Sequence, residues 1–300
     1  MVEIENITPK TVVIIAGPTA SGKSALAIEM AERYNGVVIN ADASQIYKEI
    51  TVISAAPTAE DKQKVPHRLY EIFEPGKRGS VADWLPLVVQ EIKQCWRDKK
   101  LPIVVGGTGF YIEALVKGAS PIPETEPEIK QKVAQIIEKE GAQGLYQQLQ
   151  KIDARGAAMV HANDMTRIRR ALEIFLSTGR SIADWFEMPY VSSLPEAQFV
   201  IVAKLPALNI LDEKCRLRVD AMIKNGALEE VKNLMNKKIP FDFPVMRAIG
   251  VPEFCAYLKG DVSLSEAAEL VKLHTRQYAK RQLTWFRNRL KQLSAKIIEA

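Results

Sequence analysis

A glycine-rich turn between a short apolar run and a helical pattern constrains the fold of this chain more than any other feature. The turn, Gly17-Pro18-Thr19-Ala20-Ser21-Gly22-Lys23-Ser24, fits the pattern G-x-x-x-x-G-K-[ST]. It follows the apolar run 12–16 and precedes a helical pattern over 23–33. Glycine lets the backbone curl so that N–H groups point inward, and the helix N-terminus adds positive potential. The turn therefore predicts a site for phosphate oxygens, with Lys23 on the phosphate and Ser24 as a Mg²⁺ ligand.

Three further apolar runs, at 37–41, 101–105 and 199–203, do not alternate with polar residues. Such runs are typical of strands buried on both faces, as in a parallel sheet with helices outside. A helical pattern at 81–97 separates the second run from the third. We predict an α/β fold with a P-loop NTPase-like parallel sheet core flanked by helices.

Residues 121–196 differ from this alternation of strands and helices. Prolines punctuate the beginning of the segment, at Pro121, Pro123 and Pro127. Helical patterns then follow without a convincing strand, at 129–140, 145–150 and 165–177. We predict a catalytic core of residues 1–120 and 197–300, and an all-helical insertion domain at 121–196. Further helical patterns complete the core, at 211–223, 228–235, 252–258 and from 263 to about 290.

Asp42 directly follows the run 37–41, at the carboxyl end of a predicted strand. In open α/β sheets this edge faces the ligand crevice, where a carboxylate can bind Mg²⁺ or accept a proton. A helix cap or a turn is the alternative role for this aspartate. The run 101–105 ends in Gly106-Gly107-Thr108-Gly109, without the acidic Mg²⁺ ligand that an NTPase usually has there. The pattern thus predicts polyphosphate binding rather than ATP hydrolysis.

The net charge of +5 is concentrated in one segment. No acidic residue occurs from 270 to 298, but eight basic residues do: Lys272, Arg276, Lys280, Arg281, Arg287, Arg289, Lys291 and Lys296. The rest of the chain has the other 33 of the 41 basic residues and all 36 acidic residues, a net charge of −3. Clustered positive charge predicts contact with a phosphate backbone, and a solvated helix face is the alternative. Trp285 and Phe286 lie in an apolar helical pattern, which predicts a place in the core rather than stacking on bases.

Cysteines and histidines show no metal-ligand spacing. We expect Cys95, Cys215 and Cys255 to be buried free thiols. A structural hydrogen bond is the expected role of His67. No apolar run approaches the roughly 20 residues that span a membrane, and no signal-peptide pattern follows 12–16. We therefore expect a cytoplasmic protein with no membrane partner, and a monomer by default.

Several motifs agree in order and spacing with one known family over essentially the whole chain. They are GPTASGKSALA at 17–27, the segment 42–47, Pro66-His67-Arg68-Leu69, VGGTGFYIEAL at 105–115, RRALE at 169–173 and YAKRQLTWFRN at 278–288. With these motifs the chain resembles the tRNA dimethylallyltransferases, also called isopentenyl-tRNA transferases. The resemblance implies transfer of a dimethylallyl group from dimethylallyl diphosphate to N6 of the adenosine next to the third anticodon base, with Mg²⁺ as cofactor.

The resemblance also implies roles for particular residues. The turn from Gly17 to Ser24 would bind the diphosphate, and Asp42 would be the general base for N6. Thr108 and Arg218 would stabilise the departing diphosphate. Contacts with the tRNA anticodon stem-loop are implied for Asp42, Ala43, Ser44, Gln45, Thr108, Lys130, Thr166, Arg167, Ile168, Arg169 and Arg170. To these the basic segment adds Lys280 and Arg281.

The chain departs from the family pattern at a few positions, and these concern base contacts rather than the reaction. Ala43 stands where a serine is common, Thr166 where glutamine is common, and Lys130 where arginine is common. The segment 49–57 lacks the Gly-Thr-Ala-Lys-Pro motif that is usual in the family.

Three alternatives remain open: a small-molecule P-loop kinase, an adenylate (AMP) isopentenyltransferase and a non-catalytic RNA-binding module. The GGTG turn and the acid-free segment argue against the kinase. The helical insertion and the basic segment favour a large polyanionic acceptor over free AMP. An RNA-binding module would leave the turn and Asp42 without a purpose.

Overall fold

The chain divides into two units in a computed structural model that describes residues 3–293 and 296–299. Unit 1 consists of Met1–Lys117 and Ser193–Ala300, and unit 2 of Gly118–Ser192. The boundaries expected from sequence, after residues 120 and 196, lie three and four residues further along the chain.

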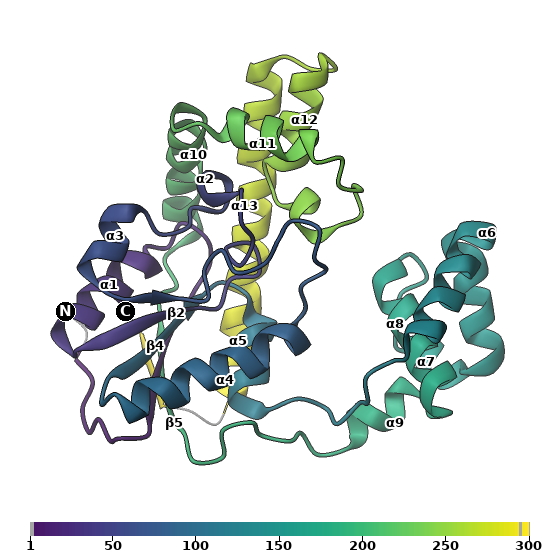
Figure 1. Cartoon of the computed structure of the whole chain (residues 1–300), viewed down its shortest axis with the longest axis horizontal. Coiled ribbons are helices and arrows are strands. Elements are labelled where there is room, and N and C mark those ends of the chain that lie inside the picture. The colour runs from purple at the N-terminus through teal and green to yellow at the C-terminus, as the bar shows by residue number, and fades with distance from the viewer. Residues whose placement is uncertain (1–2, 294–295, 300) are drawn as a thin grey trace. The chain divides into compact units, whose positions relative to one another are not determined.

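A six-stranded sheet in the order β3-β2-β4-β1-β5-β6 forms the centre of unit 1 (Figure 1). Its strands are β1 Thr11–Ala16, β2 Gly36–Asn40, β3 His67–Arg68, β4 Leu101–Gly106, β5 Gln198–Ala203 and β6 Lys296–Glu299. Every pair is parallel. The predicted α/β class is confirmed, with the four apolar runs as β1, β2, β4 and β5. The edge strands β3 and β6 were not predicted, because two and four residues are too few to show a pattern.

Burial on both faces explains why the strands show no alternation. In β1, Val12 and Ile14 join one core cluster, whereas Val13 and Ile15 join the other. The first cluster includes residues of α4 (Val81–Arg97), α5 (Gly109–Lys117) and α13 (Leu264–Arg289). The second includes residues of α1 (Lys23–Arg33). The apolar residues of β1 therefore contact apolar side chains on either face of the sheet.

Side-chain caps mark the N-terminal ends of two long helices in unit 1. The hydroxyls of Ser80 and Ser263 cap α4 and α13, each in a capping box with an acidic residue at the third helical position. The bounds of α1 and α4 are those predicted from sequence. The remaining α-helices of the unit are α2 Thr51–Ser54, α3 Ala59–Lys64, α10 Leu208–Lys224, α11 Ala227–Asn236 and α12 Val251–Lys259. Of these, α2 and α3 were not predicted, nor was α5, which begins within the GGTG turn.

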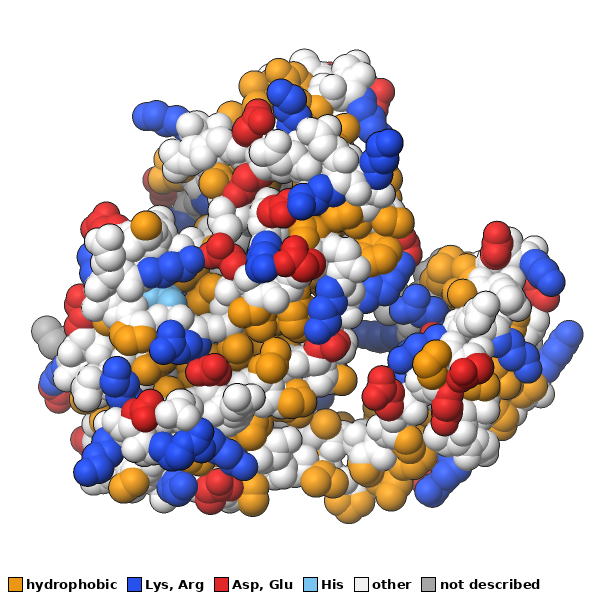
Figure 2. Space-filling model, in the orientation of Figure 1, with side chains coloured by type: hydrophobic (Ala, Val, Ile, Leu, Met, Phe, Trp, Pro, Cys, Tyr) orange, Lys and Arg blue, Asp and Glu red, His pale blue; other side chains and the backbone are white. Residues whose placement is uncertain are grey.

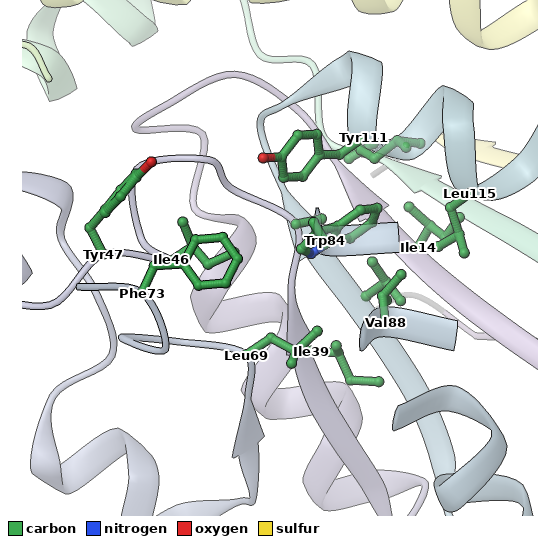
Figure 3. Packing of buried hydrophobic residues seen from close by; sticks show 14 of the residues in the cluster. Ile14, Ile39, Ile46, Tyr47, Leu69, Phe73, Trp84, Val88, Tyr111 and Leu115 are labelled. Carbon is green, nitrogen blue, oxygen red and sulfur yellow. The ribbon is translucent and has the colours of Figure 1, made fainter. Parts of the chain in front are cut away.

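An aromatic cluster supports the carboxyl end of β2 (Figure 3). The rings of Trp84 and Tyr111 stack with centroids 4.6 Å apart. The indole of Trp84 donates a hydrogen bond of 2.8 Å to the carbonyl of Asn40, the last residue of β2. Phe286 is fully buried and Trp285 packs against the same core, so the predicted core role of this pair is confirmed.

Unit 2 is built from helices around a core of its own. They are α6 Pro127–Ile152, α7 Ala154–Ala158, α8 Met165–Thr178 and α9 Ile182–Glu187. Val133, Leu149 and Leu172 meet in the core. Non-helical backbone at Gly141, with φ of 64°, interrupts α6 between the two helices predicted there. Glycine suits this break because it has no Cβ to clash at positive φ.

The cysteines and His67 have the structural roles expected of them. All three cysteines are buried free thiols, and His67 Nδ1 lies 2.9 Å from the carbonyl oxygen of Val65. Within residues 3–293 and 296–299, no helix is long and apolar enough to cross a membrane. Basic and acidic side chains are interspersed on the face of unit 1 seen in Figure 2.

Candidate active site

The carboxyl ends of the central strands meet at one edge of the sheet, because all the strands run in the same direction. The glycine-rich turn follows β1, Asp42 follows β2, and Thr108 follows β4. A cavity of about 790 Å³ lies at this edge. Its walls include Lys23, Ser24, Asp42 and Arg218, all of them predicted site residues.

Close packing determines the shape of the glycine-rich turn. A Cβ on Gly17 would lie 2.3 Å from the carbonyl oxygen of Lys204, so only glycine fits there. Gly22 has φ of 86°, in the left-handed region that favours glycine. The Lys23 ammonium donates a hydrogen bond of 2.6 Å to the carbonyl of Pro18. The buried Ser21 hydroxyl has no hydrogen-bond partner within the described part of the chain. Ser21 does not line the cavity, whereas Thr19, Gly22, Lys23 and Ser24 of the same turn do.

Arg218 reaches the turn from α10. Its Nη1 donates to the hydroxyl of Thr19 at 2.5 Å, and its Nη2 donates to the carbonyl of Ile53 at 3.3 Å. Nε is buried and has no hydrogen-bond partner among residues 3–293 and 296–299. Unpaired buried donors are costly, so this N–H is a candidate contact for an anionic ligand.

Desolvated cations give the cavity its electrostatic character. Burial lowers the pKa of the Lys23 ammonium to about 8, against the opposing effect of Asp42 and with a smaller contribution from Arg218. Burial also lowers the pKa of the Arg218 guanidinium, and Asp42 again opposes the shift. Two cations that face one carboxylate leave an excess of positive charge, which a polyphosphate would neutralise.

The carboxylate of Asp42 is held by the loop that carries it. The buried Asn40 side chain accepts from the Asp42 N–H at 2.8 Å and donates to the Asp42 carbonyl at 3.1 Å. Asp42 Oδ1 accepts from the N–H of Ser44 at 2.9 Å. Oδ2 makes no hydrogen bond to the described residues, and the side chain lines the cavity. One carboxylate oxygen is therefore available to a ligand.

Thr108 supports the same loop from β4. Its hydroxyl accepts from the N–H of Ala43 at 3.0 Å, and its own N–H donates to the carbonyl of Ala41. The residue does not line the cavity as Lys23 and Arg218 do. The geometry gives Thr108 a place beside the Asp42 loop, and its implied contact with diphosphate stays a prediction.

The other predicted residues of the Asp42 loop also lie at the cavity. Ala43, Ser44 and Gln45 line it. The Gln45 amide donates to the carbonyls of Ser54 and Ala55, at 3.1 and 2.7 Å. These two hydrogen bonds connect the Asp42 loop to the segment 49–57, which lacks the usual Gly-Thr-Ala-Lys-Pro motif.

The remaining predicted tRNA contacts belong to unit 2. Lys130 pairs with Glu124 at 3.7 Å, and Arg169 pairs with Glu173 at 3.6 Å. Ile168 is fully buried in the core of the unit, so its side chain is closed to a contact with RNA. Three further predicted residues are present at the surface or partly exposed: Thr166, Arg167 and Arg170.

The basic segment is neutralised in its first half only. Lys272 pairs with Asp220 at 2.8 Å, and Arg276 pairs with Asp212 at 3.2 Å. Beyond them, no ion pair within the described residues involves Lys280, Arg281, Arg287, Arg289 or Lys291. Arg281 lines the cavity. The side chain of Lys296 lies outside the described part of the chain. Among the described side chains of this segment, the unpaired positive charge thus lies in the second half of α13 and on Lys291 just beyond the end of that helix.

Sequence reasoning missed Asn40 and Gln282, two buried polar residues of the site. Asn40 shapes the Asp42 loop, and Gln282 contacts both the glycine-rich turn and Gly107. A usable signal exists for Gln282. The buried stripe of α13 is largely apolar, and Thr275 and Gln282 are the polar residues in it.

Comparison with known proteins identifies the family. A model of the family described as IPP transferase matches residues 45–289. The chain belongs to the IPP transferase family. Two similar members are named tRNA dimethylallyltransferase. That of Zymomonas mobilis is 41% identical over 288 residues, which cover 96% of this chain and 91% of that protein. That of Bartonella henselae is 42% identical over 279 residues, with 93% and 96% covered.

Solved structures of the family have the same fold. The tRNA isopentenylpyrophosphate transferase of Bacillus halodurans aligns with a TM-score of 0.67 at 34% identity, covering 97% of this chain and 90% of that one. A eukaryotic dimethylallyltransferase acting on tRNA aligns with a TM-score of 0.81 at 30% identity, covering 97% and 74%.

Proposed function

We propose that this protein transfers a dimethylallyl group from dimethylallyl diphosphate to N6 of the tRNA adenosine next to the third anticodon base, and releases diphosphate. The observation that carries the proposal is one cavity that joins two desolvated cations, Lys23 and Arg218, to the carboxylate of Asp42. Such a cavity accommodates a leaving group at one end and a nucleophile at the other. The relatives named tRNA dimethylallyltransferase support the same activity.

The reaction needs a base because N6 is a weak nucleophile, with its lone pair delocalised into the adenine ring. As the new C–N bond forms, Asp42 accepts a proton from N6. The C–O bond to the diphosphate breaks, and its electron pair leaves with the diphosphate. Lys23 and Arg218 stabilise the charge that develops there.

The adenosine must leave its stack to reach the cavity. Flipping is inexpensive in a loop because the bases there are unpaired. Once inside, the base lies between the Asp42 loop and the glycine-rich turn. Enclosure aligns the amine with the allylic carbon and excludes water from that carbon.

Apolar side chains in the wall of the cavity suit the dimethylallyl group. Ile50, Ile53, Met222 and Val245 all line the cavity and are buried or nearly so. A small-molecule P-loop kinase transfers a phosphoryl group, which is polar throughout and gains little from an apolar wall. The wall therefore favours prenyl transfer over the kinase alternative.

Mg²⁺ is part of the proposal. Among the described residues no cluster of three His, Cys, Asp or Glu side chains could hold a metal ion. Mg²⁺ does not need such a cluster, because it prefers oxygen ligands and usually takes one or two from the protein and others from substrate phosphates. The Ser24 hydroxyl, at the edge of the cavity, would be a protein ligand. A bound Mg²⁺ would neutralise charge on the departing diphosphate.

Contacts with the tRNA anticodon stem-loop are proposed for three groups of residues. Ala43, Ser44 and Gln45 would meet the flipped nucleotide at the cavity. Lys280 and Arg281 would bind backbone phosphates. In unit 2 the candidates are Lys130, Thr166, Arg167, Arg169 and Arg170. A monomeric state and a cytoplasmic location stay predictions.

Mass spectrometry of tRNA nucleosides tests the function directly. Unmodified tRNA is incubated with the protein, dimethylallyl diphosphate and Mg²⁺, and then digested. N6-isopentenyladenosine should form in the complete mixture, and it should not form when dimethylallyl diphosphate is left out. Equimolar AMP should compete poorly with tRNA. Prenylated AMP with unmodified tRNA would support the adenylate isopentenyltransferase, and ATP consumption with a small acceptor would support the kinase.

A further inference from the structure

Gln282 connects the two glycine-rich turns of the site. It lies in the second half of α13, with only 7% of its surface exposed. Its Oε1 accepts a hydrogen bond of 2.8 Å from the N–H of Thr19, 263 positions away. Its Nε2 donates one of 2.8 Å to the carbonyl of Gly107, 175 positions away. One planar amide therefore spans the turn after β1 and the turn after β4.

Each of the two contacts of Gln282 leads through further contacts to a charged residue that lines the cavity. On one side, the Thr19 hydroxyl accepts from Arg218, one of the two desolvated cations. On the other side, Gly107 precedes Thr108, whose hydroxyl holds the N–H of Ala43. Ala43 follows Asp42 directly. Gln282 thus stands midway in a continuous series of contacts and chain neighbours between Arg218 and Asp42.

A glutamine is the side chain that this position requires. It offers an acceptor and a donor at fixed separation on one rigid group. Methionine would leave the Thr19 N–H and the Gly107 carbonyl without partners in a buried place. Glutamate would keep the acceptor for Thr19 but would turn a second acceptor toward the Gly107 carbonyl. The approach is close, since a Cβ on Gly107 would lie 2.4 Å from Nε2.

We propose that Gln282 is a positioning residue for prenyl transfer, which sets the separation between the diphosphate-binding turn and the Asp42 loop. This inference rests on the proposed function. Gln282 is not one of the residues that line the cavity. It acts through Thr19 and Gly107. Because reacting groups must be held within about 0.5 Å of their productive geometry, a small shift of one turn against the other slows the chemistry more than it weakens binding.

The test compares Gln282→Met and Gln282→Glu with the wild-type protein. Gln277→Met is the matched control, because Gln277 is exposed on the same helix. Single-turnover rates of dimethylallyl transfer to tRNA are measured together with KM for each substrate and the thermal midpoint. Both Gln282 variants should lose at least about 10-fold in the single-turnover rate, with KM for dimethylallyl diphosphate within about threefold. The control should keep wild-type values.

A purely structural role would give a different result. Gln282→Met could lower the thermal midpoint. If the folded variant nevertheless transferred the dimethylallyl group at the wild-type single-turnover rate, the proposal would be overturned. A rise in KM equal to the loss in rate would also overturn it. If Gln282→Met does not fold, Gln282→Glu, which keeps the shape and the bond to Thr19, decides the matter alone. An inactive wild-type protein would instead overturn the proposed function, so the two failures are distinguishable.

Discussion

The Nη1 atom of Arg218 donates a hydrogen bond of 2.5 Å to the hydroxyl of Thr19, across 199 positions of the sequence. Nη2 of the same guanidinium donates to the carbonyl of Ile53. These bonds orient the rigid fork beside the glycine-rich turn and leave Nε for a ligand. A lysine, with a single ammonium on a flexible stem, cannot make the same set of contacts.

Replacing Arg218 by lysine should therefore lower kcat/KM for dimethylallyl diphosphate by about 10- to 100-fold, the range of a lost charged hydrogen bond. Steady-state kinetics with saturating tRNA measures the loss. Arg216→Lys is the matched control, because Arg216 is exposed on the same helix and pairs loosely with Glu269 at 3.8 Å. That change should have an effect below about twofold. Equal losses in both variants would contradict the role of Arg218.

Replacing Asp42 by asparagine should abolish proton acceptance while keeping the loop. The new side chain has an oxygen that can still accept from the Ser44 N–H. We expect the single-turnover rate to fall by at least about 10²-fold, with tRNA affinity nearly unchanged; Asp42→Ala should behave likewise. Filter binding and rapid-quench assays measure the two quantities. Asp261→Asn, in an exposed loop, serves as the control. Rapid turnover by the Asp42 variants would remove this carboxylate from the chemistry.

The lowered pKa of Lys23 predicts a pH dependence of diphosphate binding. With a pKa of about 8, Lys23 is charged below that pH and neutral above it. The affinity of the free protein for dimethylallyl diphosphate should then fall as the pH rises through about 8. The ligand itself does not lose negative charge over that range, so the fall reports on the protein. Calorimetric titration at a series of pH values measures it.

Lys23→Arg provides the control for this pH dependence. Arginine stays charged throughout the range, so its affinity should not show the same fall. A flat profile for the wild-type protein, or the same fall in Lys23→Arg, would assign the pH dependence to another group.

Neutralising Lys280 and Arg281 together should weaken tRNA binding and its salt dependence. The slope of log K against log salt should become shallower by about one to two, as expected for two lost phosphate contacts. The matched control neutralises Lys272 and Arg276, which changes the net charge equally. Those residues already pair with Asp220 and Asp212, so their removal should alter the slope less. An unchanged slope in the first variant would support a solvated helix face.

The central strands and the glycine-rich turn could be predicted from sequence because they depend on neighbouring residues. An unbroken apolar run indicates burial on both faces, and β1, β2, β4 and β5 all show one. The bounds of α1 and α4 follow from local signals, such as Gly22 before α1 and the Ser80 cap of α4. The edge strand β3 could not be predicted from sequence, because its two residues form a strand only through their pairing with β2.

Part of the site was beyond such reasoning. Asp42 could be singled out because it follows a buried strand. The side chains that support its loop could not be predicted. In the sequence, Asn40 is only the last residue of that strand, and Thr108 belongs to a distant turn. Charge counting indicated a basic segment, but Asp220 and Asp212, which pair with Lys272 and Arg276, lie on another helix, α10. A second partner of Lys272, Glu269, lies on α13 just before the acid-free segment.

The amino-acid sequence by itself determined the glycine-rich turn, the parallel strands and the segment where basic residues collect. Each of these depends on residues close together in the chain, through backbone freedom, burial and charge. Only the tertiary structure decided which side chains meet. The sheet order β3-β2-β4-β1-β5-β6 places the ends of β2, β4 and β1 side by side. Helices from the far end of the chain then bring Arg218 and Gln282 to the same edge, because the core buries their apolar faces against that sheet.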